Sequence, residues 1–110
     1  MVFFVRTSNC PLFSRYREDY FDDDALLELQ GYLLAQPTAG DVVPGTGGVR
    51  KLRWARVGMG KRGGVRVLDY LQDAKGRIWL LTVYAKSARE NIPNELLNEL
   101  RKVADHAEID

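Results

Sequence analysis

The chain has 110 residues, a length typical of one domain, and its 16 basic and 15 acidic residues give a formal net charge of +1. A hydrophobic content of 45% provides for a core and excludes a disordered chain. One cysteine excludes an internal disulfide and a cysteine-based zinc site, and no apolar run reaches the roughly 20 residues of a membrane span. We therefore expect a single cytoplasmic domain over residues 1–110.

The N-terminal part of the sequence predicts a strand followed by two helices. Val2–Val5 is a β-prone run that ends at polar residues. Pro11–Tyr20 begins with a proline that a first helical turn accepts, and the helix expected there has an apolar stripe of Leu12, Tyr16 and Tyr20. Three aspartates at 22–24 then precede leucines at helical spacing, which predicts a second helix over about Asp24–Gln36 and a helical hairpin with the first.

The rest of the sequence predicts a sheet and a last helix. The segment Pro37–Gly48 is rich in proline and glycine and indicates a loop. The alternating or apolar runs that follow predict three strands joined by short connections: Val49–Arg56, Val65–Leu71 and Ile78–Ala85. Pro93 opens an amphipathic helix. The order β-α-α-β-β-β-α makes this an α+β fold with a small, mostly antiparallel sheet packed with helices.

Positive charge is concentrated in the middle of the chain. No acidic residue lies between Asp41 and Asp69, while seven basic residues do: Arg50, Lys51, Arg53, Arg56, Lys61, Arg62 and Arg66. Without them the chain would hold nine basic residues against 15 acidic ones, so the rest carries a net charge of about −6. Glycines in PGTGGVR and VGMGKRGGVR would let backbone approach a phosphate chain. The pattern favours RNA or DNA as a partner over an ordinary solvated loop.

Other residue types give little support for metal or histidine chemistry. The three aspartates at 22–24 point in different directions on a helix start, so capping explains them better than a metal site. Cys10 has no histidine near it in sequence, and the only histidine, His106, falls in the last helical turn. We expect no metal and no cofactor. If the protein cleaves RNA, lysine, arginine and tyrosine must act on the 2′-hydroxyl and phosphate, and Tyr84 and Lys86 lie on one face of their strand.

The glycine and arginine pattern resembles a known family. The stretch GDVVPGTGGVRKLRWARVGMGKRGGVRVLDY and the later IWLLTVYAKS are similar to the HigB-like branch of the RelE/ParE toxin superfamily, and the similarity covers nearly the whole chain. It implies a RelE-like fold and a toxin of a type II toxin–antitoxin system. Such a toxin is a metal-independent, ribosome-dependent mRNA interferase that blocks translation. Its expected partners are a helix-turn-helix antitoxin, the ribosome and mRNA, with DNA reached only through the antitoxin.

By motif position, the resemblance places the catalytic cations on Lys51, Arg53 and Arg66, with Tyr84 and Lys86 as further catalytic candidates. Which of these acts as acid or base is left open. An arginine and a tyrosine that RelE uses after the last strand have no match at Ser87 or near Ile92 and Pro93. The remaining bases of the strip are expected to bind RNA: Arg50, Arg56, Lys61 and Arg62. Two alternatives share these features, a ParE-like toxin that inhibits DNA gyrase without cutting nucleic acid and a plain RNA-binding module.

Overall fold

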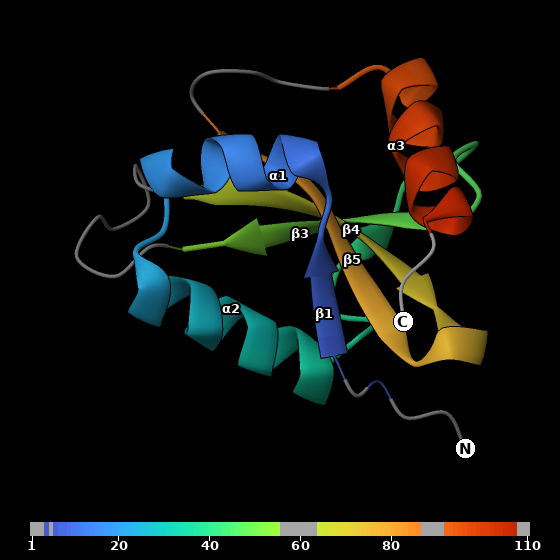
Figure 1. The fold of residues 1–110 in the computed structure, drawn as a ribbon. Helices are drawn as coiled ribbons and strands as arrows, with labels where there is room; N and C mark the ends of the chain where they lie inside the picture. The colour runs from blue at the N-terminus through green and yellow to red at the C-terminus, as the bar shows by residue number, and fades with distance from the viewer. Residues whose placement is uncertain (1–3, 5, 56–63, 87–91, 108–110) are drawn as a thin grey trace.

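The structure is a computed structural model that describes residues 4, 6–55, 64–86 and 92–107. Its sheet has five strands in the order β1-β5-β4-β3-β2, from β1 (Arg6–Asn9), β2 (Asp41–Val42), β3 (Val49–Trp54), β4 (Val65–Gln72) and β5 (Arg77–Ala85). β1 runs parallel to β5, and all other neighbours are antiparallel. The helices are α1 (Pro11–Tyr16), α2 (Asp23–Ala35) and α3 (Asn94–His106), arranged around the sheet as in Figure 1. The predicted α+β class is confirmed, and the predicted order β-α-α-β-β-β-α is found with one addition, the short strand β2 within the segment expected to be a loop.

The first strand lies later in the chain than the sequence predicts. The strand is formed by Arg6–Asn9, whereas Phe4, in the expected Val2–Val5 run, lies outside it, and residues 2, 3 and 5 fall outside the described part. Pairing with Arg77–Leu80 of β5 fixes this register. A parallel partner more than 60 residues away supplies the hydrogen bonds, so local β-propensity is a poor guide to this strand.

Helix α1 takes the place of a strand along part of the edge of β5. β1 pairs only with the first residues of β5, and α1 packs against this strand, with the Cys10 backbone N–H donating to the Leu80 carbonyl at 2.9 Å. The helix is shorter than predicted: its α-helical part ends at Tyr16, and Arg17–Asp19 continue as a 3-10 turn. From the sequence, the two helices are expected to form a helical hairpin. They follow one another in the chain but diverge along the sheet (Figure 1).

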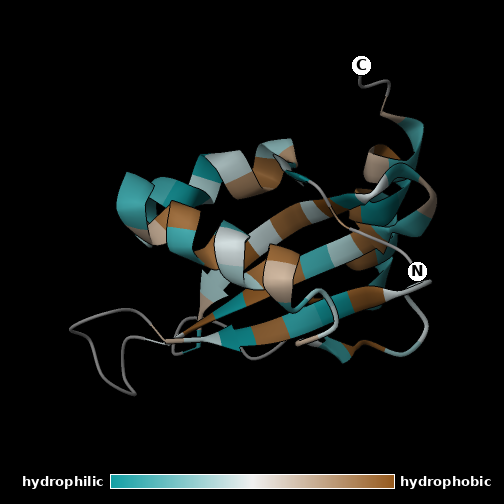
Figure 2. Cartoon of the chain, turned by 90° about the horizontal axis from the view of Figure 1, so that it is seen from below, coloured by the Kyte–Doolittle hydropathy of each residue, from teal (hydrophilic) through white to brown (hydrophobic). Residues whose placement is uncertain are grey.

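Each face of the sheet has its own apolar core. One face packs α2 through Leu29 and Leu33 against strand residues such as Leu52 and Val67. On the other face, Leu97 and Ala104 of α3 pack in a second cluster. The strand residues of this cluster are Val49, Leu68, Trp79, Leu81 and Tyr84. Hydrophobic and hydrophilic segments alternate along the strands, as Figure 2 shows, because successive side chains point to opposite faces. The alternation that predicted β3 is therefore confirmed.

The glycine-rich PGTGG segment is a structural turn held by α3. Three α3 side chains donate to its carbonyls: Asn94 to Pro44 at 2.8 Å, Asn98 to Gly45 at 3.2 Å and Arg101 to Thr46 at 2.8 Å. The Thr46 side chain is fully buried; its hydroxyl donates to the Val43 carbonyl at 2.6 Å and accepts from the Val49 N–H at 3.1 Å. These carbonyls face α3, so the segment is explained by packing and does not require a phosphate.

We predict that Gly47→Ala destabilises the protein by about 2 kcal/mol or more. Gly47 has a φ of 71°, and a Cβ there would lie 2.7 Å from the Arg101 Nε atom. Gly31→Ala is the matched control, because nothing lies within 4 Å of a Cβ at this exposed position of α2 and alanine favours a helix. Urea unfolding of both variants measures the effect. Equal stability of the two would contradict the structural role of the turn.

Candidate functional site

The strand register brings two arginines and a tyrosine into one row across the sheet. Arg53 on β3 is the direct partner of Arg66 on β4, and Arg66 is the direct partner of Tyr84 on β5. Directly paired residues point to the same face, so the three side chains are neighbours. Lys51, two residues before Arg53, shares this face. The sequence assigned these four residues from separate strands, and the fold places them together; we call Lys51, Arg53, Arg66 and Tyr84 the cation row.

Members of the cation row differ in exposure. Arg53 is exposed, Lys51 and Arg66 are half-buried, and Tyr84 is 8% exposed. The Arg66 guanidinium donates one long hydrogen bond, at 3.5 Å, to the carbonyl of its neighbour Val65. Like charges on directly paired residues such as Arg53 and Arg66 repel, which costs stability unless an anion lies between them. The row is therefore suited to bind phosphate.

The sequence did not predict the acid at the edge of the cation row. β2 is only two residues long and lies inside the segment expected to be a loop, yet it pairs with β3 and sets Asp41 directly opposite Lys51. Asp41 and Lys51, with Arg53, line a hollow of about 210 Å³. No acidic residue lies within the basic segment of the sequence, as expected, but strand pairing places the carboxylate-bearing Asp41 beside Lys51.

Of the other predicted site residues, the structure describes Lys86 and Arg50. Lys86 is exposed just beyond β5, where its backbone N–H donates to the Gly64 carbonyl at 3.2 Å. Arg56, Lys61 and Arg62 lie outside the described residues. Their assignment to RNA binding remains a prediction.

Arg50 is separated from the cation row. It alternates with Lys51 and so points to the opposite face, where its Nη1 atom donates to the Gly40 carbonyl at 2.8 Å and more weakly to that of Thr38 at 3.4 Å. Its direct partner on β4 is Asp69. The structure thus gives Arg50 a role in holding the loop after α2, and the sequence pattern grouped it with the strip only because it is adjacent in sequence.

Asp69 is a fully buried acid in the core between the sheet and α2. Its side chain is 0% exposed, and neither carboxylate oxygen has a hydrogen-bond partner in the described part of the structure. Burial raises the pKa of Asp69 to about 7, and the positive charge of Arg50 opposes part of that rise. The carboxyl is therefore neutral in the folded protein below about pH 7, whereas an unfolded chain would ionise it near pH 4.

We predict that Asp69→Asn reduces the loss of stability as pH rises from about 4 to about 7. The folded state holds the Asp69 proton more tightly than the unfolded chain, so this group makes the wild type less stable as pH rises through 7. Between pH 5 and pH 8, the wild type should lose about 2 to 3 kcal/mol more than the variant. Urea titrations at the two pH values measure this difference, and parallel pH profiles would contradict it.

Cysteine, histidine and the three aspartates have structural surroundings. Burial raises the pKa of the Cys10 thiol to about 11, which disfavours a thiolate. Asp22 caps α2 by accepting from the Ala25 N–H at 2.8 Å, as predicted, and Asp23 pairs with Arg17 at 2.8 Å. Among the residues that the structure describes, no three or more histidine, cysteine or acidic side chains converge as metal ligands.

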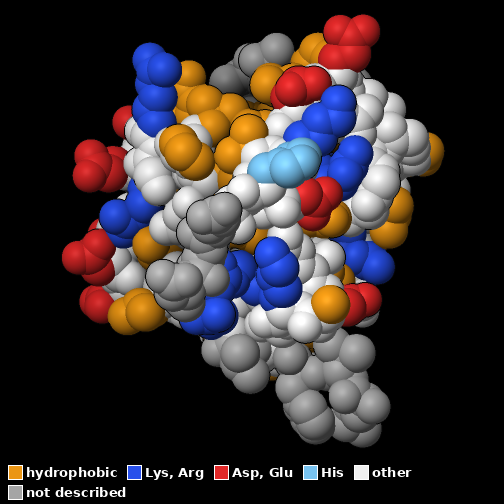
Figure 3. All heavy atoms as spheres, turned by 45° about the vertical axis from the view of Figure 1, so that its right-hand side comes forward, with side chains coloured by type: hydrophobic (Ala, Val, Ile, Leu, Met, Phe, Trp, Pro, Cys, Tyr) orange, Lys and Arg blue, Asp and Glu red, His pale blue; other side chains and the backbone are white. Residues whose placement is uncertain are grey.

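Charge near the end of α3 is balanced. Arg101 pairs with Asp105 at 3.0 Å and Lys102 with Glu99 at 3.5 Å. Figure 3 shows the corresponding mixture of basic and acidic side chains around the pale blue histidine. This surface differs from the cation row, where Arg53 and Arg66 oppose one another.

These features describe a small α+β protein with basic side chains gathered on one face of its sheet. A family model described as the RelE toxin of the RelE / RelB toxin-antitoxin system matches residues 13–109, and the chain belongs to this family. It is therefore a toxin of a toxin–antitoxin system, a family that implies an antitoxin partner.

A solved structure supports the fold assignment. The chain is similar to E. coli toxin RelE, solved as a double arginine-to-alanine variant in the free state, with a TM-score of 0.56 and 18% sequence identity. The similarity covers 93% of this chain and 97% of the other. In the described part of the chain, no helix has the length and apolar character needed to cross a bilayer.

Proposed function

We propose that this toxin inhibits translation by cleaving mRNA bound to the ribosome. Membership of the RelE family supports the proposal, and the observation that carries it is the direct pairing of Arg53, Arg66 and Tyr84 across three strands. A nuclease needs positive charge concentrated where the phosphate gains negative charge. A ParE-like toxin that acts by binding gyrase has no such need, so the row favours the interferase over that alternative.

The proposed reaction is attack by the ribose 2′-hydroxyl on the adjacent phosphate. Arg53 and Arg66 would stabilise the negative charge that accumulates on the phosphate oxygens, and positioning by the ribosome would supply the geometry. The 2′-hydroxyl gives its proton to a base as its oxygen bonds to phosphorus, the bond between phosphorus and the 5′-oxygen breaks, and the 5′-oxygen takes up a proton from an acid. Lys51, Tyr84 and Lys86 are the candidates for acid and base. The products are a 2′,3′-cyclic phosphate and a 5′-hydroxyl, and the step uses no metal.

The finer family assignment and the partners are part of this proposal. The sequence pattern favours the HigB-like branch, a helix-turn-helix antitoxin and action in the cytoplasm on ribosomes and mRNA. Arg56, Lys61 and Arg62 would add RNA contacts next to the row, because they join β3 to β4 along the chain.

Induction of the toxin in growing cells should stop protein synthesis first, with mRNA cut within coding regions. Ribosome complexes formed with mRNA and then mixed with toxin should give fragments that end in 2′,3′-cyclic phosphate. Pulse-labelling and analysis of the RNA ends measure the two results. Fragments ending in a 3′-hydroxyl would exclude attack by the 2′-oxygen. Intact mRNA with an early stop of DNA synthesis would instead support the gyrase alternative.

Arg66→Ala should reduce mRNA cleavage about 100- to 1,000-fold without lowering the melting temperature. The substitution removes one charge contact to the transition state and also relieves repulsion from Arg53. Lys75→Ala, an exposed basic residue in the turn before β5, is the matched control and should retain activity. Single-turnover cleavage and thermal melts decide the matter. Early melting of Arg66→Ala would give this residue a structural role instead.

Leu68→Ala distinguishes loss of fold from loss of chemistry. Leu68 is 1% exposed in the core beneath α3, and truncation of a buried leucine costs about 2 to 5 kcal/mol. This variant should lose activity in parallel with its melting temperature, unlike Arg66→Ala. Cleavage assayed well below the melting temperature would recover for Leu68→Ala only.

A further inference from the structure

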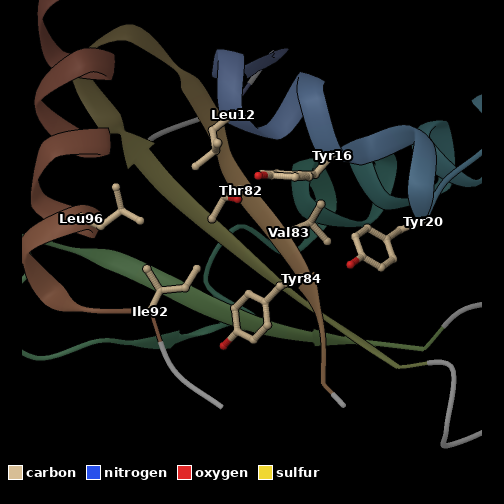
Figure 4. A pocket seen from close by; sticks show the side chains of 8 residues that line it. All are labelled: Leu12, Tyr16, Tyr20, Thr82, Val83, Tyr84, Ile92 and Leu96. Atoms are coloured by element: carbon tan, nitrogen blue, oxygen red, sulfur yellow. The ribbon is translucent and has the colours of Figure 1, made fainter. Parts of the chain in front are cut away.

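A hollow of about 310 Å³ lies between α1, β5 and the start of α3. Its walls carry three tyrosine rings: Tyr16 on α1, Tyr20 just after it and Tyr84 on β5. Figure 4 shows the Tyr16 ring directed from α1 toward Thr82 on β5, with Ile92 and Leu96 on the opposite side. The volume lies at the lower end of the range for small-molecule pockets, so it suits a single flat ring system better than a protein helix.

The hollow and the cation row share Tyr84. Tyr84 lines the hollow and is also the direct cross-strand partner of Arg66. Neighbouring strands are about 4.8 Å apart, so a ligand in the hollow lies one strand from the Arg66 backbone. Arg15 adds positive charge on the other side, with its guanidinium carbon 5.6 Å from the centroid of the Tyr16 ring. An aromatic hollow thus has a basic group on each side.

We infer that the hollow binds one unstacked base of single-stranded RNA, whose phosphate lies over Arg66 and Arg53. Tyrosine rings stack on any base, and recognition of single-stranded RNA commonly places splayed bases on aromatic side chains. The three tyrosine rings around the hollow suit the flat faces of a base. The hydroxyl of Thr82, a residue that is 3% exposed, suits its polar edge. The inference rests on the proposed function, because it takes RNA as the substrate of the cation row.

The sequence of α1 explains why its side chains line the hollow. Phe13 is fully buried in the core on the α2 face, while Leu12 and Tyr16 line the hollow. Because β1 pairs only with Arg77–Leu80, the later part of β5 pairs with β4 on one edge and packs against α1, in place of β1, on the other. The hollow therefore forms where a helix replaces an edge strand, next to the end of β5 that carries Tyr84.

Photo-crosslinking tests the inference on the unmodified protein. The full chain is mixed with short single-stranded RNAs that carry 4-thiouridine at one position at a time, irradiated, and analysed by peptide mass spectrometry. One RNA position should crosslink to peptides containing Tyr16, Tyr20 or Tyr84. Crosslinks that avoid all three residues while RNA is bound would overturn the inference.

An abasic scan measures the base contact. Removal of one base should weaken RNA binding to the wild type about 5- to 100-fold, the range for loss of base stacking on an aromatic side chain. Tyr16→Leu should weaken binding of intact RNA by a similar factor and show little further loss with that abasic RNA. Tyr16→Phe, which keeps the ring, should bind like the wild type. Tyr32→Leu is the control, because the Tyr32 ring packs on Trp54, 5.1 Å away between centroids.

The outcomes separate this inference from the proposed function. RNA binding with no base-sensitive position, additive losses for Tyr16→Leu and the abasic RNA, or no RNA binding at all would overturn the base site. Variants that lose antitoxin binding but keep RNA binding would also overturn it and assign the hollow to the partner protein. A wild type that shows the base-sensitive position yet cuts no mRNA on ribosomes leaves the base site supported and rejects the interferase.

Discussion

The register between β3, β4 and β5 is the constraint on which the site depends. It pairs Arg53 with Arg66 and Arg66 with Tyr84, while the alternate positions Leu52, Val65 and Val67 enter the core. A slip of one residue would put the arginines into that core and the valines on the surface. The same apolar contacts that stabilise the sheet therefore hold two like charges opposite one another. Repulsion within the cation row is tolerated because hydrophobic burial fixes the register.

The two faces of the sheet are covered to different extents by the helices. α2 covers one face, and α3 covers only part of the other, where Leu97 and Ala104 meet the strands. α3 also holds the PGTGG turn through three side-chain hydrogen bonds, which orients the chain as it enters β3. The end of the sheet that carries Arg53 and Arg66 lies beyond this contact, so these side chains remain accessible. A glycine turn held by α3 thus positions the basic strand.

Sequence patterns predicted the elements whose signals are local. Alternation predicted β3, apolar runs predicted β4 and β5, and periodic apolar residues after the three aspartates or after Pro93 predicted α2 and α3. The patterns failed where pairing is distant: β1 depends on a parallel partner in β5, and the two-residue β2 has no signal of its own. Local and distant signals differ in the same way at the site. Alternation and resemblance predicted four site residues: Lys51, Arg53, Arg66 and Tyr84. The structure alone shows that Asp41 lies beside Lys51 and that Arg50 contacts the loop after α2.

Among the residues that the structure describes, Asp69 and the Arg53–Arg66 pair differ in how accessible their charges are to a ligand. Asp69 is fully buried, so its cost depends on pH and on Arg50. Arg53 and Arg66 face the surface, where a bound phosphate can offset their repulsion. A ligand that binds the folded state alone stabilises it in proportion to the logarithm of its concentration over its dissociation constant. If the cation row binds phosphate as proposed, anion binding would therefore also stabilise the folded toxin.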